Sequence, residues 1–320
     1  MFLCVSPNPS IDKRLVIPSL APGEIHRARC VQSLAGGKAT HVAMMLRTLG
    51  ETPHWIGPCG GTTGEDLVHG LRLLGIEPHA FPVKGSTRTN LELVDDAGKV
   101  TEILEPGPEL SAKEIEGFER ACRELFEKFG KYAFVLFSGS LPAGVPEDLY
   151  ARLIAEARRA GCKTLLDTGG RALQCGLESE PDFVKPNAKE AEAALGIAVT
   201  SIESATEATR KLCLHGARSV AISLGSEGLV YREGCEERIL ASSGIAVDAK
   251  STVGCGDSAF AGFAKGIADG LSGEETLKLA VACATANCLA KWPGAARKED
   301  IQDFRNRVKV QRLEEETQIC

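Results

Sequence analysis

The chain has 320 residues, of which 43% are hydrophobic and 25% are charged, and its formal net charge is −6. This composition is typical of a globular protein with a sizeable core and excludes a largely disordered chain. The negative charge and an aromatic content of only 5% argue against a nucleic-acid surface and against attraction to an anionic membrane. We therefore expect neither as a partner.

No apolar run approaches the roughly 18 residues of a membrane span. The apolar start at residues 1–5 is short and has no basic lead, so it predicts a buried first strand in a cytoplasmic protein. The twelve cysteines form no Cys-x-x-Cys pair, and the six histidines show no metal-ligand spacing with them. We expect the cysteines to be free thiols that pack as small apolar residues.

The first two-thirds of the chain alternates between two kinds of segment. Short apolar runs occur at 2–6, 133–137, 163–167, 182–185 and 219–224. Amphipathic stretches lie between them, near 41–49, 64–74, 111–129, 146–160, 187–195 and 202–214. Apolar strands separated by helices predict a parallel sheet covered on both faces.

Two segments interrupt this pattern. Residues 12–34 contain two extended runs, and residues 88–105 alternate around a glycine-containing loop, which predicts a hairpin. Together they predict a small second sheet built from separate pieces of chain. After residue 252 the chain reads as entirely helical, with two Ala-rich helices at 256–269 and 274–290 and a charged tail whose end we expect to be disordered.

The strongest chemical motif is a glycine turn before a helix, Gly254-Cys255-Gly256-Asp257. Such a turn bares backbone N–H groups at the positive end of the helix and predicts an anion site. Asp257 in the first helical turn is either only a helix cap or a carboxylate that takes a proton from an attacking hydroxyl.

Four other motifs are weaker when each is taken alone. Gly36-Gly37-Lys38 before a helix is either an ordinary turn or a close approach to a polar ligand. Asn187 and Glu190 are typical of a capping box, a role compatible with ligand binding at a strand end. Glycine-bearing turns follow two strands, at 138–142 and 223–228. The arginines of the interrupting segments, Arg27, Arg29 and Arg88, suit either a solvated face or a phosphate-bearing substrate.

In this order the motifs resemble the PfkB branch of the ribokinase-like sugar kinases, from Asn8-Pro9-Ser10-Ile11-Asp12 through residue 294. Within that family the chain is similar to the enzymes of phosphorylated ketohexoses, 1-phosphofructokinase and tagatose-6-phosphate kinase. The motifs typical of this subgroup are Asn8–Asp12, Thr87–Asn90, Glu105–Pro108, Ser138–Pro142, Lys185–Asn187 and Ser223–Gly225.

The resemblance implies an α/β, ribokinase-like three-layer fold with a mostly parallel central sheet and a small β lid. It implies a main domain of residues 1–11, 35–86 and 106–305, a lid of 12–34 and 87–105, and a charged tail of 306–320. It also implies ATP and Mg²⁺. The leading hypothesis is phosphorylation of fructose 1-phosphate to fructose 1,6-bisphosphate. The alternatives are a tagatose-6-phosphate kinase, a kinase of an unphosphorylated sugar or nucleoside, and an inactive nucleotide-dependent sensor. A homodimer through the lid is a further expectation.

Roles follow from the resemblance residue by residue. Asp257 is the expected base, beside an anion hole of Gly254, Cys255 and Gly256. The nucleotide side comprises Lys185, Asn187, Ser223, Gly225 and Gly228, with Glu190 helping to hold Mg²⁺. The sugar side comprises Asp12, Arg27, Gly36, Gly37, Lys38, His41, Arg88, Asn90 and Ser138.

The chain departs from the family pattern at three places. His41 stands where relatives have an asparagine that contacts a sugar hydroxyl. Cys255 stands where they have alanine or serine, which puts an oxidisable thiol in the expected anion hole. The segment Lys291-Trp292-Pro293-Gly294 matches nothing expected near the adenine and receives no role from the sequence.

Overall fold

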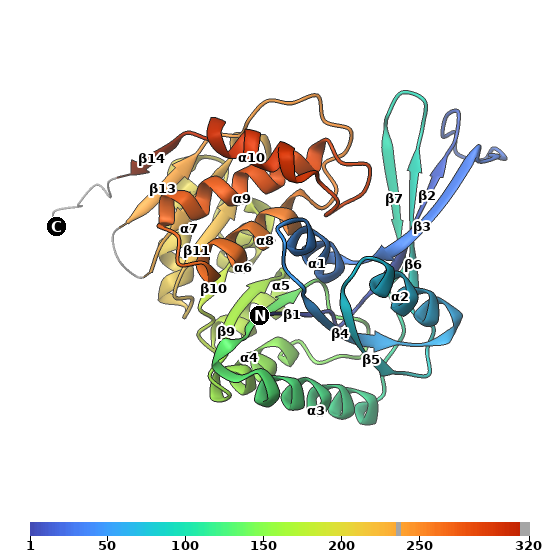
Figure 1. Cartoon of the computed structure of the whole chain (residues 1–320), viewed down its shortest axis with the longest axis horizontal. Helices are drawn as coiled ribbons and strands as arrows, with labels where there is room; N and C mark the ends of the chain where they lie inside the picture. Colours follow the sequence, from blue (N-terminus) through green and yellow to red (C-terminus); the bar gives the residue numbers. More distant parts are fainter. Residues whose placement is uncertain (235–237, 314–320) are drawn as a thin grey trace.

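A computed structural model describes residues 1–234 and 238–313 of the chain. Its main feature is a ten-stranded sheet with the order β14-β13-β12-β11-β10-β9-β8-β1-β4-β5 (Figure 1). The strands from β11 to β5 in this order pair in parallel, whereas β12, β13 and β14 are antiparallel. The strands are β1 (Phe2–Val5), β4 (His54–Cys59), β5 (Glu77–Pro82), β8 (Phe134–Ser138), β9 (Lys163–Asp167), β10 (Phe183–Val184), β11 (Val220–Ser223), β12 (Leu229–Arg232), β13 (Ile239–Ser242) and β14 (Val310–Leu313).

Helices cover both faces of this sheet and bury two separate apolar cores. One face packs against α1 (Lys38–Thr48), α2 (Gly61–Leu73), α8 (Cys255–Ala268), α9 (Gly273–Cys288) and α10 (Lys298–Arg307). The other packs against α3 (Ala112–Phe129), α4 (Leu149–Arg159), α5 (Gly170–Leu177), α6 (Ala188–Leu195) and α7 (Ile202–Leu214). This is the three-layer α/β architecture that the alternation of segments predicts.

Local sequence signals set the helix positions. A capping box of Ser111 and Glu114 starts α3, which then buries an apolar stripe at helical spacing. The glycines of α8 allow it to approach α9 closely, because a Cβ on Gly262 would lie 2.6 Å from the Cα of Ala280. The small residues of these two helices therefore serve close packing.

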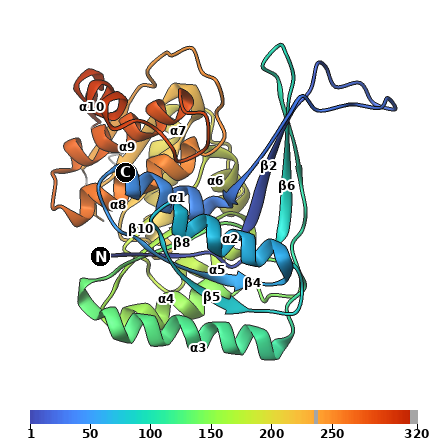
Figure 2. The same ribbon diagram turned by 45° about the vertical axis from the view of Figure 1, so that its right-hand side comes forward.

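A second sheet of four strands has the order β3-β2-β6-β7, and we call it the lid sheet. It consists of β2 (Ser10–Val16), β3 (Cys30–Gly36), β6 (Arg88–Val94) and β7 (Val100–Leu104). β2 and β6 come from the two interrupting segments and pair in parallel. Figures 1 and 2 show this sheet projecting from the main body beside α1 and α2. The prediction of a small sheet made from two pieces of chain is confirmed.

Several strands escape the sequence patterns. β4 and β5 contain three prolines, which are disfavoured in strands. They are tolerated because β5 is an edge strand and the pairing of β4 with β1 ends at Ile56, before Pro58. The prediction that everything after residue 252 is helical is wrong. Val310–Leu313, inside the expected tail, pairs with β13 and extends the main sheet. The predicted disorder at the end of the tail falls on residues 314–320, outside the described part of the chain.

In the described residues no helix has both the length and the apolar character that a membrane span needs. Ten of the twelve cysteines lie in the described part of the chain, and all ten are free thiols. This agrees with the expected small-residue packing, and Cys4, Cys122 and Cys283 are fully buried.

Candidate active site

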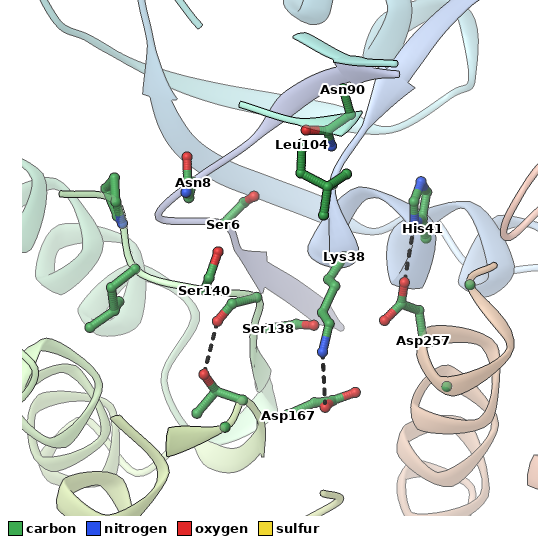
Figure 3. A pocket seen from close by; sticks show the side chains of 18 of the residues that line it. Ser6, Asn8, Lys38, His41, Asn90, Leu104, Ser138, Ser140, Asp167 and Asp257 are labelled. Carbon is green, nitrogen blue, oxygen red and sulfur yellow. Dashed lines mark hydrogen bonds and ion pairs between the residues drawn. The ribbon is translucent and has the colours of Figure 1, made fainter. Parts of the chain in front are cut away.

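A cleft of about 930 Å³ opens at the carboxyl ends of the parallel strands, below the lid sheet. This edge of an open α/β sheet is where ligands bind. Most of the site residues expected from the sequence line it: Asp12, Gly37, Lys38, His41, Arg88, Asn90, Ser138, Lys185, Asn187, Glu190, Ser223, Gly254, Gly256 and Asp257. They come from both sheets and from the N-termini of α1, α6 and α8 (Figure 3).

The N-terminus of α8 faces the cleft. Gly254 is its N-cap with φ of 77°, a left-handed conformation that favours glycine, and Asp257 lies buried in the first turn. The N–H of Cys255 donates a long hydrogen bond to the carbonyl of Thr252 at 3.3 Å. The Cys255 thiol does not line the cleft, since its Sγ lies 3.3 Å from that of Cys288 on α9. The expectation of a thiol within the anion hole is thus wrong, because the side chain points into the α8–α9 contact.

The imidazole of His41 bridges two carboxylates. Its Nδ1 lies 3.1 Å from Asp257 Oδ2, an ion pair drawn in Figure 3, and its Nε2 lies 2.9 Å from Asp12 Oδ2. Only the doubly protonated ring has an N–H for each of these acceptors. His41 therefore joins the sugar-side carboxylate of the lid sheet to the expected base on α8.

The pKa values of this cluster follow from its geometry. Burial alone lowers the pKa of His41, but the hydrogen bonds and negative charges of Asp12 and Asp257 outweigh burial and raise the pKa to about 10. Burial raises the pKa of Asp12, yet the contacts with His41, Ser10 and Asn90 bring it below its ordinary value. At neutral pH His41 is accordingly an imidazolium that donates to a carboxyl group on each side.

This bridge makes the stability of the protein depend on pH. Because the folded-state pKa of His41 lies above the ordinary value of 6.5, its contribution is complete below about pH 6.5 and is lost as pH rises toward 10. We expect His41→Asn to lower the free energy of unfolding at pH 6 by up to about 5 kcal/mol, since each pKa unit between 6.5 and about 10 corresponds to about 1.4 kcal/mol. The deficit shrinks toward pH 10. Denaturant unfolding at several pH values measures it.

The matched control is His69→Asn, which changes an exposed histidine of α2. It is expected to cost little at any pH. A deficit of His41→Asn that stays constant from pH 6 to pH 10 would show that the bridging ring is neutral.

The opposite end of the cleft holds Asp167 at the end of β9. Its carboxylate is buried and lies 3.1 Å from Lys185 Nζ and 3.8 Å from Lys38 Nζ, and neither of its oxygens accepts a hydrogen bond. Burial raises the pKa of Asp167 despite the two ammonium groups. The charge of Asp167 raises the pKa of Lys38 in turn. Lys38 thus points toward Asp167 and Glu190 within the cleft.

Asn187 and Glu190 form the capping box of α6. Asn187 Oδ1 accepts from the Glu190 N–H, and Glu190 Oε2 accepts from the Asn187 N–H, each at 2.9 Å. The other carboxylate oxygen of Glu190 lies 3.4 Å from Lys38 Nζ. Gly169 makes room for this side chain, because a Cβ there would lie 2.8 Å from Glu190 Cγ. The capping role is confirmed, and it leaves Glu190 facing the cleft beside Asp167.

At the lid end, polar side chains surround Asp12. Asn90 Nδ2 donates to Asp12 Oδ1 at 3.0 Å, and Arg88 donates to the carbonyls of Asn8 and Glu105. Asn90 Oδ1 and Arg88 Nε are buried and find no hydrogen-bond partner among the described residues. Unpartnered buried polar atoms are costly and require a ligand or water, so this end of the cleft suits a polar guest.

Five expected site residues do not line the cleft: Cys255, Gly225, Gly228, Gly36 and Arg27. Gly36 instead admits Asp12, because a Cβ there would lie 2.1 Å from the Asp12 carboxyl carbon. Gly228, with φ of 112°, packs against the Ser242 carbonyl. The placement of Arg27 at the cleft is wrong for a physical reason. β3 begins only at Cys30, so Arg27 lies in the exposed connection before it and shares no strand face with the site.

Asp167, Asn8 and Trp292 are among the cleft residues that the sequence patterns did not assign to the site. Asp167 carries a detectable signal, since an acidic residue closes a predicted apolar strand. Asn8 belongs to a quoted motif and binds the Pro106 carbonyl of another, at 3.0 Å. Trp292 carries no local signal, because its neighbours in space come from the lid sheet.

Comparisons with known proteins agree with this arrangement. The family described as pfkB family carbohydrate kinase matches residues 9–298. A 1-phosphofructokinase of Rhodobacter capsulatus is 34% identical over 87% of each chain. One of Bacillus subtilis is 30% identical over 98% of this chain and all of its own. Among solved structures, phosphofructokinase-2 of Escherichia coli in complex with potassium has a TM-score of 0.89, with 28% identity over 96% of this chain and 98% of its own. The chain belongs to the pfkB family of carbohydrate kinases.

Proposed function

We propose that this kinase transfers the γ-phosphoryl group of ATP to fructose 1-phosphate and forms fructose 1,6-bisphosphate and ADP. The observation that carries the proposal is the cleft itself. Asp257 lies in it at the N-terminus of α8. Lys38 and Lys185 line one part of the cleft, and Arg88 lines another, together with buried polar atoms that have no hydrogen-bond partner among the described residues. Relatives named 1-phosphofructokinase, 30–35% identical over most of the chain, support this choice of substrate.

Asp257 acts as the base in this proposal. His41 occupies its Oδ2, and among the described residues no partner is recorded for Oδ1. Oδ1 of Asp257 accepts the proton of the C6 hydroxyl group while the oxygen of that hydroxyl forms a bond to the γ-phosphorus of ATP. The bond between the γ-phosphorus and the oxygen that bridges it to the β-phosphorus breaks, and ADP leaves with the electron pair. The N-terminus of α8 and the ammonium of Lys185 stabilise the negative charge on the transferred phosphoryl group. Phosphoryl transfer depends mainly on such positioning and electrostatic stabilisation.

The sugar phosphate occupies the lid end in this proposal. Asp12 accepts hydrogen bonds from its hydroxyls, and Asn90 donates to them. Ser138, whose buried Oγ finds no partner among the described residues, forms a further hydrogen bond with the sugar. The guanidinium of Arg88 faces the 1-phosphate. Burial lowers the pKa of Arg88, and a dianionic ligand offsets that unfavourable environment.

The nucleotide side fits a magnesium ion with its phosphates. Mg²⁺ binds through one or two carboxylates plus phosphate oxygens. Asp167, next to Glu190, offers two oxygens that have ion-pair contacts with lysines and accept no hydrogen bond from the described residues. When bound, Mg²⁺ neutralises charge on the β- and γ-phosphates. Lys38 and Lys185 hold the carboxylates in place, while Ser223 and Asn187 lie on the side expected for the nucleotide.

We also propose that the lid segments move as a unit and that the outer face of the lid sheet pairs with a second copy of the chain. This face carries Leu15, Val31, Leu93 and Ile103. Val31 and Ile103 lie on the two edge strands, β3 and β7, and are about half exposed. A cluster of exposed apolar residues marks an interaction surface. Sedimentation analysis is expected to give a dimer for the wild type and a monomer for Val31→Glu. A monomeric wild type at micromolar concentration would contradict this proposal.

A coupled ADP-release assay tests the function. Fructose 1-phosphate, fructose 6-phosphate, tagatose 6-phosphate, free fructose and free ribose are compared at equal concentration with ATP and Mg²⁺. We expect the largest kcat/KM with fructose 1-phosphate. A larger value with tagatose 6-phosphate or a free sugar would replace the proposed substrate. Nucleotide binding without turnover of any substrate would indicate a sensor.

A further inference from the structure

The segment Lys291–Gly294, to which the sequence assigns no role, packs against the glycine turn of α8. A Cβ on Gly254 would lie 2.6 Å from the Pro293 Cβ, so the Pro293 side chain occupies the space beside this glycine. The N–H of Gly294 donates to Asn287 Oδ1 at 2.7 Å, and Asn287 Nδ2 donates to the Val253 carbonyl at 2.8 Å. One buried asparagine therefore fixes this segment and the turn before α8 relative to each other.

The lid sheet reaches the same segment through the side chain of Arg14 on β2. Its guanidinium carbon lies 4.5 Å from the centre of the Trp292 ring, and its Nη1 donates to the Lys291 carbonyl. Its other nitrogens form a two-pronged ion pair with Glu92 on β6, with distances of 2.6 and 2.9 Å. Both charged side chains are nearly buried. Glu92 thus holds the planar guanidinium in the orientation that stacks on the indole.

These contacts connect the two halves of the cleft. Arg14 lies two residues from Asp12 on the same face of β2, and Trp292 lies two residues before Gly294. Glu92 and Trp292 both line the cleft. Glu92 belongs to the lid sheet, as Arg14 does, whereas Lys291 and Trp292 do not. A lid sheet farther from α8 would therefore keep the pair of Arg14 and Glu92 and lose the contacts of Arg14 with the Lys291 carbonyl and the indole.

We propose that Arg14 is a positioning residue for phosphoryl transfer, which fastens the lid sheet to the segment supporting the glycine turn and so excludes water from the transferred group. This inference rests on the proposed kinase function. In this role Arg14 couples two events. Sugar phosphate bound by the lid sheet stabilises the closed cleft. The closed cleft then places the acceptor hydroxyl beside the glycine turn and keeps water away from it.

The kinetic test compares Arg14→Met with the wild type. Loss of one cation–π contact and one charge-assisted hydrogen bond is expected to raise the KM for fructose 1-phosphate about tenfold and to change the KM for ATP less than twofold. The fraction of ATP hydrolysed without transfer to sugar is expected to increase several-fold. Trp292→Leu, which leaves the pair of Arg14 and Glu92 intact, is expected to give the same pattern, and the double variant to add little to either.

Two controls separate this role from a structural one. Lys13→Met removes a cation from the same strand on its opposite face, and it is expected to change neither KM nor hydrolysis. Arg14→Met/Glu92→Gln removes the unpaired carboxylate left in the lid sheet, and it should retain the defect of Arg14→Met. Restoration of the wild-type KM and hydrolysis in this double variant, or additive effects of Arg14→Met and Trp292→Leu, would overturn the proposal.

Tryptophan fluorescence tests the contact without turnover. The chain has two tryptophans, and Trp55 is completely buried in the core, so quenching by iodide reports on Trp292. In ligand-free protein Arg14→Met is expected to increase iodide quenching, and in the wild type fructose 1-phosphate with ADP should reduce it. Equal quenching of both ligand-free proteins would overturn the contact. If no sugar phosphate is a substrate, the ADP-release assay rejects the proposed function. Iodide quenching of the two ligand-free proteins then still decides whether Arg14 contacts Trp292.

Discussion

Replacing Asp257 by asparagine is expected to lower kcat by about 10²–10⁴-fold, the range typical of a lost general base. The amide keeps the size of the carboxylate and accepts a hydrogen bond from His41, but it takes no proton from the sugar hydroxyl. The fall should appear in kcat with little change in either KM, since Asp257 contributes only when the hydroxyl attacks. Steady-state kinetics with the substrate found in the panel assay measures it.

The neighbouring Ser258 provides a control for Asp257→Asn. Its hydroxyl donates to Asn287 on the buried side of α8 and not toward the cleft. Ser258→Ala should therefore keep most of kcat while losing some stability. If Asp257→Asn retained more than a tenth of the wild-type kcat, another group would have to accept the proton. An equal loss in kcat and in nucleotide affinity would instead indicate that Asp257 caps α8 and has no role in proton transfer.

Replacing Lys185 by methionine is expected to lower the free energy of unfolding by about 3 kcal/mol at pH 8, as is typical when one partner of a buried ion pair is removed. Lys185 and Asp167 are each 2% exposed, and their charged atoms lie 3.1 Å apart. Without the ammonium, Asp167 keeps only Lys38 at 3.8 Å. Denaturant unfolding followed by circular dichroism measures the loss.

The same variant should have a characteristic pH dependence. The folded-state pKa of Asp167 is already raised by burial and rises further without Lys185. A carboxyl group with a raised folded-state pKa loses stability as pH increases through that value, so the deficit of Lys185→Met is largest at pH 8 and shrinks toward pH 5. Adding Asp167→Asn should recover most of the deficit at pH 8.

A matched surface pair shows whether burial is the cause. Lys163 and Asp182 are also 3.1 Å apart, but the lysine side chain is 54% exposed. Lys163→Met is expected to cost less than about 1 kcal/mol. Similar losses in Lys163→Met and Lys185→Met would contradict the argument from desolvation.

Most of the fold could be predicted because its signals are local. Apolar runs such as 133–137 and 163–167 became β8 and β9, and capping residues marked the starts of α3 and α6. β4 and β5 could not be predicted, because tertiary position tolerates prolines that local rules exclude from strands. β14 was missed for a similar reason: this four-residue segment of a charged tail forms a strand by pairing with the edge of β13.

In the candidate site, too, features with local sequence signals could be predicted and features that depend on distant residues could not. Glycine turns at strand ends could be placed from spacing, so Gly254, Gly256 and Asp257 reach the cleft as expected. The bridge that His41 forms could not be predicted from spacing, because Asp12 and Asp257 lie 29 and 216 residues away from it in sequence. Arg27 was misplaced because alternation along the chain indicates a shared face only where a strand exists, and β3 begins after it.

The position of β1 limits the order in which the chain assembles. The first strand of the chain lies in the middle of the main sheet, between β4 and β8. A nascent chain that ends before residue 138 therefore has only one of the two complete neighbours of β1, and both cores lack the helices that follow. The lid sheet needs no residue beyond Leu104 for its pairing. During synthesis, the four strands of the lid sheet are therefore all present before the main sheet can be completed.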